Sequence, residues 1–164
     1  MSNEYKDWAA DFAQDILDNK ALCDKYPVLI PRLWRTGEIS ECWEYENTML
    51  DDIPTGWRIA FGEQWAKDVQ EAINKIPQPD RDKIYILQLK EKFGEFRQYF
   101  SHYTDDLNAV IRKYEELSRK TCVGCGAEAT KYSTGWISPW CDPCAEKIND
   151  KIVPIEEFME DDFR

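Results

Sequence analysis

Two pairs of cysteines near the C-terminus constrain this chain more than any other feature of its sequence. Cys122 and Cys125 form the first pair, Cys141 and Cys144 form the second, and 15 residues separate the pairs. A Cys-x-x-Cys turn lets two thiolates reach one ion, and a second such pair completes a tetrahedral site without an open position. The spacing therefore predicts one structural zinc ion, which contributes folding energy rather than catalysis.

The residues around these cysteines predict the shape of a zinc module over residues 121–150. Gly126 directly follows the first pair and permits a tight turn. Residues 131–138 flank Gly135 and favour a short hairpin, after which Cys144 lies at the start of a helix. A knuckle, a hairpin and a helix that bears the last ligands predict a treble clef, with a plain zinc ribbon as the alternative.

A redox function is the alternative for the second cysteine pair. A Cys-x-x-Cys motif at the start of a helix is also typical of a redox pair, because the helix start lowers the pKa of a thiol. Such a pair would not need a second pair at zinc spacing, so the metal site is favoured. The two remaining cysteines, Cys23 and Cys42, are predicted to be small buried hydrophobic residues.

The composition indicates a folded chain. Of its 164 residues, 43% are hydrophobic and 13% are aromatic, and aromatic side chains bury large apolar areas. No stretch approaches the roughly 20 apolar residues that span a bilayer. The N-terminus lacks the basic and apolar segments of a signal peptide, so we expect a cytoplasmic protein. A reducing compartment also favours metal binding over disulfides.

The N-terminal third predicts one helix followed by an irregular segment. Tyr5, Trp8, Phe12 and Ile16 recur at helical spacing and predict a stripe that packs into the core, with acids on the other face. Residues 27–55 are interrupted by prolines and glycines. They predict a long loop that packs onto the body or contains short elements.

The rest of the chain predicts an α+β fold. Apolar spacing predicts helices at 57–76 and 105–119. Between them, residues 83–100 predict a hairpin that turns at or near Gly94, with its first strand covered on both faces. The predicted architecture is a set of helices packed on this small antiparallel hairpin or sheet.

These predictions divide the chain into three parts. Residues 1–120 form the α+β body, and residues 121–150 form the zinc module. Residues 151–164 form an acidic tail, and its last part, residues 156–164, is predicted to be exposed or frayed.

Charge is distributed unevenly along the chain. The net charge is −11, with −7 in residues 1–52, +1 in residues 53–120 and −5 in residues 121–164. This acidity argues against duplex nucleic acid or an anionic membrane as the main partner. It favours either simple solubility or a negative surface that docks on a basic protein. Mimicry of DNA is one form of the second hypothesis, and it requires a continuous acidic stripe spaced like phosphates.

No familiar catalytic set is present in the sequence. His102 is the only histidine, which excludes metal sites and nuclease folds that need two or more imidazoles. The zinc deaminase pattern fails around His102 and before Cys141, and no nucleophile elbow or phosphate-binding glycine loop occurs. Glu91 and Glu95 could form an acid–base pair, but a solvated hairpin face explains them equally well. We expect His102 at the surface or at the end of the hairpin.

One segment resembles a known group of proteins. Residues 89–99, LKEKFGEFRQY, resemble the KEKFG-x-LRFY signature of uncharacterised phage and prophage proteins. Those proteins carry a C-terminal pair of Cys-x-x-Cys motifs after a helix with a serine near its end, matched by Ser118. They often have a Gly-Trp pair before the hairpin, matched by Gly56 and Trp57. The resemblance covers residues 54–147.

The chain departs from this pattern at two positions. Phe96 replaces the usual leucine and Gln98 replaces an aromatic residue, while the first 50 residues match less well. The resemblance implies a phage origin, a bacterial host cell and a zinc module. It implies no reaction.

The same segment carries a basic cluster. Lys90, Lys92 and Arg97 stand close together in an otherwise acidic protein. They are predicted either to pair with the acidic N-terminal segment or to contact a phosphate or an acidic partner. Trp136 and Trp140 in the zinc module could add surfaces on which bases stack.

The leading hypothesis is a non-enzymatic, zinc-containing phage accessory protein that binds a host protein, with defence and DNA-processing factors as candidate targets. The first alternative is a nucleic-acid-binding module that uses the basic hairpin and the zinc module. The second is an enzyme with an unfamiliar carboxylate site, which would need a deep pocket that holds acids of perturbed pKa. The sequence leaves the oligomeric state open.

Overall fold

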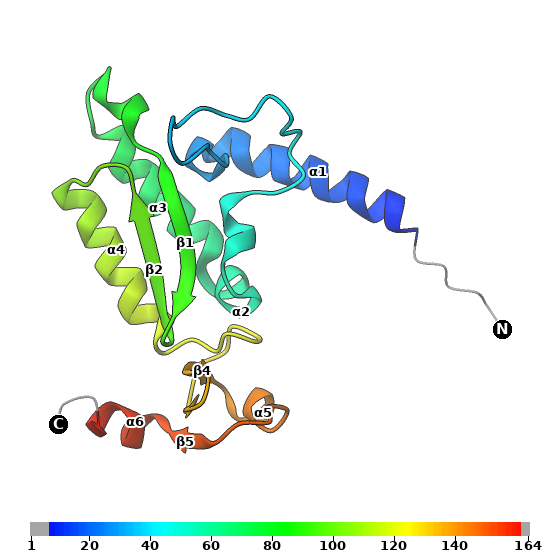
Figure 1. Ribbon diagram of the computed structural model, residues 1–164, viewed down its shortest axis with the longest axis vertical. Coiled ribbons are helices and arrows are strands. Elements are labelled where there is room, and N and C mark those ends of the chain that lie inside the picture. The colour runs from blue at the N-terminus through cyan, green and yellow to red at the C-terminus, as the bar shows by residue number, and fades with distance from the viewer. Residues whose placement is uncertain (1–6, 162–164) are drawn as a thin grey trace.

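The computed structural model describes residues 7–161, and it has an α+β fold (Figure 1). Two long helices lie against one face of a two-stranded hairpin, and a module with a three-stranded sheet follows at the tip of that hairpin. Helix α1 projects from the side of the body that lies away from α4. No helix within residues 7–161 is long and apolar enough to cross a bilayer.

The helical stretch over residues 55–74 forms the centre of the body. It consists of α2 (Thr55–Trp57), a π-helical turn η3 (Arg58–Gly62) and α3 (Glu63–Asn74). Apolar residues at intervals of three and four fall on one side of such a helix and pack into the core. The buried members of this stripe are Trp57, Phe61, Trp65, Val69, Ala72 and Ile73.

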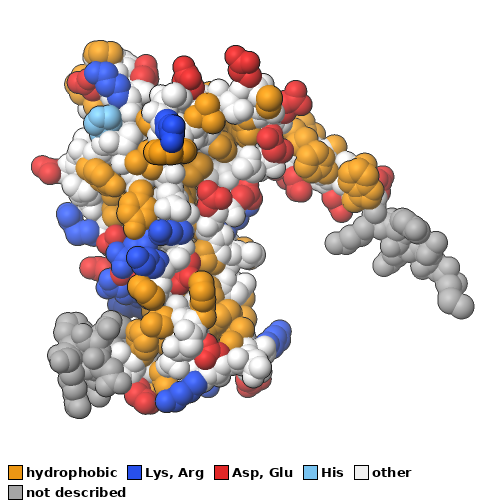
Figure 2. All heavy atoms as spheres, in the orientation of Figure 1, with side chains coloured by type: hydrophobic (Ala, Val, Ile, Leu, Met, Phe, Trp, Pro, Cys, Tyr) orange, Lys and Arg blue, Asp and Glu red, His pale blue; other side chains and the backbone are white. Residues whose placement is uncertain are grey.

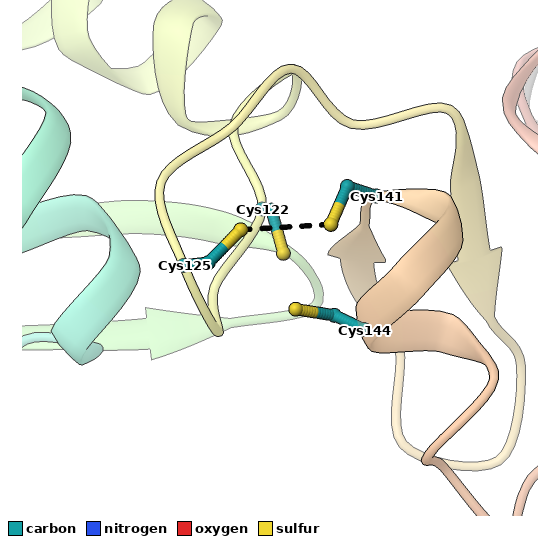
Figure 3. Close-up of side chains that lie close together, drawn as sticks. All are labelled: Cys122, Cys125, Cys141 and Cys144. Atoms are coloured by element: carbon teal, nitrogen blue, oxygen red, sulfur yellow. Dashed lines mark hydrogen bonds between the residues drawn. The ribbon is translucent and has the colours of Figure 1, made fainter.

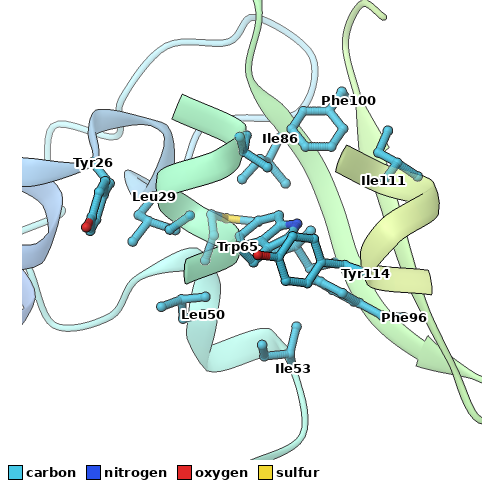
Figure 4. Packing of buried hydrophobic residues seen from close by; sticks show 14 of the residues in the cluster. Tyr26, Leu29, Leu50, Ile53, Trp65, Ile86, Phe96, Phe100, Ile111 and Tyr114 are labelled. Atoms are coloured by element: carbon cyan, nitrogen blue, oxygen red, sulfur yellow. The ribbon is translucent and has the colours of Figure 1, made fainter. Parts of the chain in front are cut away.

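The hairpin is formed by β1 (Ile86–Lys92) and β2 (Glu95–Phe100), which pair antiparallel. Its inner face packs on α3 and α4 (Asp105–Ser118), and Figure 4 shows the resulting core. The expectation that the first strand is covered on both faces is wrong, because Leu87 is exposed. A register shift between Ile86 and Gln88 places the buried residues Ile86 and Leu89 on the same, inner face.

Polar side chains connect the hairpin to both helices inside the core. Gln98 is buried, and it accepts a 2.7 Å hydrogen bond from Trp65 Nε1 and donates one of 3.2 Å to the carbonyl of Ile111. Ser118 Oγ accepts a bond from the amide of Phe96 and donates to the carbonyl of Glu115. Buried polar groups need such partners. Both ends of the Gln98 amide are therefore paired inside the core.

Helix α1 (Trp8–Lys25) contradicts one core prediction. Its C-terminal half packs on the body through the buried residues Asn19 and Cys23. In its N-terminal half, Trp8 is 76% exposed and Phe12 is 48% exposed, and Ile16 is only half-buried. These residues do not pack into the core because the helix extends past the edge of the body (Figure 1). Tyr5 lies outside the described residues.

Residues 27–55 form a packed loop with two short 3₁₀ helices, η1 (Pro27–Leu29) and η2 (Met49–Asp52). Leu29 and Leu50 from these turns are fully buried in the core. Of the two lone cysteines, Cys23 is buried as expected, whereas Cys42 is exposed in the loop, so that prediction was wrong.

The C-terminal module is built from short elements. They are β3 (Lys131–Ser133), β4 (Ser138–Trp140), α5 (Asp142–Ala145), β5 (Ile152–Pro154) and α6 (Ile155–Asp161). The strand order is β4-β3-β5, and both pairings are antiparallel.

In the tail, Glu156 and Glu157 are exposed as expected, but they belong to α6 rather than to a frayed end. Val153 in β5 is buried, and the ring of Phe158 stacks on Tyr132 with centroids 4.4 Å apart. The pairing of β5 with β3 gives these apolar residues a surface to cover, which outweighs the acidity of the segment.

The hydroxyl of Ser118 gives a test of the core network. We expect Ser118→Ala to lower the free energy of unfolding by about 1–3 kcal/mol, because it leaves the buried amide of Phe96 without an acceptor. Urea unfolding measures this loss. Ser40→Ala is the control, since that hydroxyl accepts only a 3.4 Å bond in an exposed loop. Equal stability of the two variants would contradict the assignment.

Candidate metal centre

The four predicted ligands converge on one point. The sulfur atoms of Cys122, Cys125, Cys141 and Cys144 all lie within 4.8 Å of one another, and Figure 3 shows them turned inward. The shortest marked separation, between Cys125 Sγ and Cys141 Sγ, is 3.5 Å. Four sulfurs held about 2.3 Å from one zinc ion in a tetrahedron lie about 3.8 Å apart. The cluster can therefore hold one metal ion, and four thiolates at this spacing suit zinc.

Backbone hydrogen bonds fix the first cysteine pair in a tight knuckle. The amide of Cys122 donates to the carbonyl of Ala127, and the amide of Gly126 donates to the carbonyl of Cys122. Gly126 has a φ of 83°, which a residue with a Cβ rarely adopts. The glycine that follows the first pair is therefore required by the turn.

The second pair is delivered by the β3–β4 hairpin and the short helix α5. Cys141 is the N-cap of α5, and Cys144 lies in its single turn. The amide of Val123 donates to the carbonyl of Pro139 at 3.0 Å, which joins the two halves of the site. The order of knuckle, hairpin and short helix matches the sequence prediction, and β5 adds a strand that was not foreseen.

The electrostatics of the four thiols are those of a cation site. Burial opposes ionisation of Cys122, but the backbone amides of Cys141, Cys125 and Gly124 offset it and lower the pKa of Cys122 to about 7. The hydrogen bond with Cys141, followed by burial, raises the pKa of Cys144 to about 12. Because the thiols are close together, a second negative charge among them is unfavourable. A cation that bonds to all four sulfurs would offset the repulsion between the thiolates.

The metal module is joined to the body at the start of α2. The amide of Gly56 donates a 2.9 Å hydrogen bond to the carbonyl of Val123, and Trp57 Nε1 donates one of 2.8 Å to the carbonyl of Thr121. A Cβ on Gly56 would clash with the carbonyl oxygen of Cys122. The Gly-Trp pair seen in the sequence is therefore the docking point of the knuckle.

The module also supports the turn of the β1–β2 hairpin. A Cβ on Gly94 would lie 2.8 Å from the ring of Tyr132, so the ring needs a glycine beneath it. The hydroxyl of Tyr132 donates a 2.6 Å bond to the carbonyl of Arg119 at the end of α4. Residues far apart in the sequence thus meet around the metal centre.

The basic cluster lies on the outer face of the hairpin. Lys90 and Arg97 are direct cross-strand neighbours, and Lys92 is one alternation further along β1. Arg97 forms a 3.1 Å ion pair with Glu95, and Glu95 also pairs with Arg119. Among residues 7–161, none of the three cations pairs with the acidic N-terminal segment, so that prediction is not supported.

The two tryptophans of the module differ in environment. Trp136 is 74% exposed, and its Nε1 donates a 3.3 Å bond to Glu91. Trp140 is half-buried, and its Nε1 donates to the hydroxyl of Ser133. Only Trp136 therefore presents a free aromatic surface, because tertiary packing takes up the ring of Trp140.

Phe93 belongs beside Trp136 and was not singled out from the sequence. It occupies the hairpin turn with a φ of 54°, and its ring is 67% exposed. A two-residue turn with positive φ at both positions is normally filled by Asn, Asp or Gly. The sequence therefore contained a signal for Phe93, because a bulky aromatic residue directly before Gly94 is unusual in a tight hairpin turn.

The remaining candidates do not form a catalytic site with one another. Glu91 stands opposite Phe96 and Glu95 opposite Lys92, so strand alternation directs the two carboxylates to opposite faces. Glu95 is buried in its ion pairs, which makes the solvated-face explanation wrong for that residue. His102 is exposed just after β2, as expected.

A cleft of about 490 Å³ lies between η1, α3 and the segment before β1. Its two arginines already donate to backbone carbonyls, Arg32 to Gly37 and Arg81 to Asn74 and Ile76. Burial raises the pKa of Asp52 and of Glu115, but neither residue lines this cleft.

No family model, curated protein or solved structure matches this chain. The resemblance to phage proteins therefore stays a prediction that rests on residues 89–99, the Gly-Trp pair and the cysteine spacing. The function has to be argued from the geometry of the chain itself.

We expect the purified protein to bind one zinc ion per chain. Cys125→Ser removes one of four ligands and is expected to reduce the zinc content far below one per chain. Cys42→Ser is the matched control, because Cys42 is an exposed cysteine outside the cluster, and it is expected to retain the ion. Elemental mass spectrometry of dialysed protein measures both. Full zinc content in Cys125→Ser would contradict a four-cysteine site.

The docking of the knuckle is tested at Gly56. We expect Gly56→Ala to lower the free energy of unfolding by about 1–3 kcal/mol, because its Cβ meets the backbone of the knuckle. Gly62→Ala is the control in the same helical stretch, where the nearest atom would be 3.4 Å away. It is expected to be neutral or to stabilise by up to about 1 kcal/mol. Urea unfolding of both variants distinguishes a close contact from a general loss of glycine.

Proposed function

We propose that this chain is a non-enzymatic accessory protein that binds another protein through helix α1. The observation that supports this is the continuity of one helix face. Asn19 and Cys23 on that face pack on the body, and the same face continues toward the N-terminus through Ile16, Phe12 and Trp8 at intervals of four. The body covers only the C-terminal half of the stripe.

An uncovered stripe of this kind is a feature of helices that bind in grooves. Trp8 and Phe12 are large, rigid side chains, and burying each of them against a partner would contribute about 1.5–3 kcal/mol. Aromatic anchors at helical spacing are what a helix-in-groove interface uses. In Figure 2, hydrophobic side chains gather along the projecting arm of the molecule.

The acidic residues of α1 indicate the charge that the partner should carry. Asp7, Asp11, Asp15 and Asp18 are exposed and follow the aromatic stripe along one side. The partner should therefore offer an apolar groove with lysines or arginines along one rim. An antiparallel pairing of two α1 helices would bring two such acidic rows together, which disfavours a simple self-pairing. The row spans about 16 Å, which suits the rim of an interface better than mimicry of a long duplex.

The nature of the partner follows from the resemblance to phage proteins. A phage accessory protein acts inside a bacterial cell, so a host protein is the proposed partner, with defence and DNA-processing factors as candidate targets. In this proposal the metal is zinc and the module is a treble clef with a structural role. The nucleic-acid alternative concerns a different surface, formed by the hairpin and the module.

The proposal is tested by affinity capture from a bacterial host lysate treated with nuclease. We expect Trp8→Ala with Phe12→Ala to reduce capture of the specific partner at least tenfold, because interface aromatics often contribute 2 kcal/mol or more each. Leu17→Ala is the matched control. Leu17 is also highly exposed, and at about 100° per residue it lies on the opposite side of α1 from Trp8. A partner captured equally by all three proteins would show that α1 is not the binding surface.

A further inference from the structure

A second uncovered surface lies where the hairpin meets the metal module. We call it the hairpin-tip surface, and it contains aromatic and basic side chains, namely Lys90, Lys92, Phe93, Arg97, Tyr99 and Trp136. We propose that the hairpin-tip surface binds single-stranded nucleic acid, with one base between Phe93 and Trp136 and phosphates on Lys90, Lys92 and Arg97. This inference does not depend on α1.

The first support is a small pocket between the two rings. Phe93 and Trp136 line it together with Gly135, Ile137 and the side chains of Glu91 and Lys92. Its volume is about 150 Å³. An apolar cavity of about this size accommodates one aromatic ring such as benzene, whereas sites for whole small molecules begin at about 300 Å³. The pocket therefore suits a single flat ring.

The second support is the conformation of Phe93. Its φ of 54° is unfavourable for a bulky residue, yet its ring is left mostly exposed instead of packing on the body. Asn or Gly would form this turn without strain. Strained residues that gain little inside the fold are concentrated at binding sites, where they are held for recognition. An exposed ring at the hairpin tip is well placed to stack on a base.

The third support is the charge next to the pocket. Lys90 and Lys92 alternate along β1 and so face the same side of the hairpin, with Arg97 directly opposite Lys90. Neither lysine forms an ion pair within the described part of the chain, and Arg97 Nε is buried without a hydrogen-bond partner. Figure 2 shows Lys and Arg side chains gathered over the hairpin beside hydrophobic ones.

These features favour a single strand over other ligands. Unpaired bases can enter the pocket and stack on aromatic side chains, whereas the bases of a duplex are already stacked. Tyr99 adds a ring on the outer face of the hairpin, 5.4 Å from Lys90 Nζ. An acidic peptide would satisfy the lysines but supplies no regular series of rings. The net charge of −11 limits nonspecific attraction, so the rings must contribute much of the affinity.

The first experiment measures fluorescence anisotropy of labelled 15-nucleotide oligothymidylate and oligouridylate at 50 and 200 mM salt. Three phosphate contacts give a slope of log affinity against log salt of roughly −2, so binding should weaken about 20-fold over this range. With Lys90→Ala and Lys92→Ala combined, one contact remains and the loss should be only about threefold. The two oligonucleotides show whether DNA or RNA is preferred.

The second experiment separates binding from folding. Phe93→Asn removes the ring and places a residue in the turn that tolerates positive φ, so Tm should stay the same or rise while affinity falls. Stacking of about 1–3 kcal/mol per base corresponds to a loss of roughly 5- to 150-fold. Trp136→Ala should behave alike, and Trp136→Phe should retain most of the affinity. Trp34→Ala is the control, because Trp34 is a similarly exposed tryptophan in the N-terminal loop.

Four results would overturn the proposal. They are no binding by the wild-type protein at 50 mM salt, equal binding of a duplex, an equal loss in Trp34→Ala, and unchanged affinity in Phe93→Asn. A concentration-dependent dimer that the Phe93 and Trp136 variants disrupt would also overturn it. That result would assign the surface to a second copy of the chain, whose α1 carries both acids and aromatic rings.

Discussion

The contact between the metal knuckle and the start of α2 connects the two halves of this protein. A module whose strands are three residues long buries little apolar surface, so a metal ion held by its four cysteines would supply much of its stability. The hydrogen bonds from Gly56 and Trp57 to the knuckle fix the position of the module relative to the body. Trp57 is fully buried and packs against Phe61 and Phe96, so the docking point is also part of the core.

The same dependence extends to the hairpin-tip surface. Phe93 comes from the hairpin and Trp136 from the module, and the pocket exists only because the two segments are held side by side. Tyr132 supports the turn beneath Gly94, and the bond from Trp136 to Glu91 joins the segments directly. A metal ion held by the four cysteines would thereby help to determine the geometry of a candidate binding surface. This gives a physical reason why the hairpin motif and the cysteine motifs occur together in one chain.

Local patterns predicted the elements, and long-range contacts decided which of their residues are buried. Cysteine spacing gave the metal ligands, and apolar spacing gave the helices and the hairpin, because these signals depend on neighbours within a few residues. The stripe on α1 has the same period whether or not anything covers it, so the sequence could not show that Trp8 and Phe12 are exposed. Trp136 and Trp140 likewise differ through long-range packing, such as the bond from Trp140 to the hydroxyl of Ser133. The pairing of β5 with β3 is also non-local, which explains why the tail was expected to fray.

The two uncovered surfaces differ in their dependence on the metal centre. The stripe on α1 belongs to one helix that is anchored through Asn19 and Cys23, and in Figure 1 this helix lies at the other end of the body from the metal module. The hairpin-tip pocket spans the junction between module and body and loses one wall if the module unfolds. Metal occupancy can therefore alter recognition at the hairpin tip while the α1 stripe stays intact. If both proposals hold, binding through α1 would be independent of the metal, and binding at the hairpin tip would depend on it.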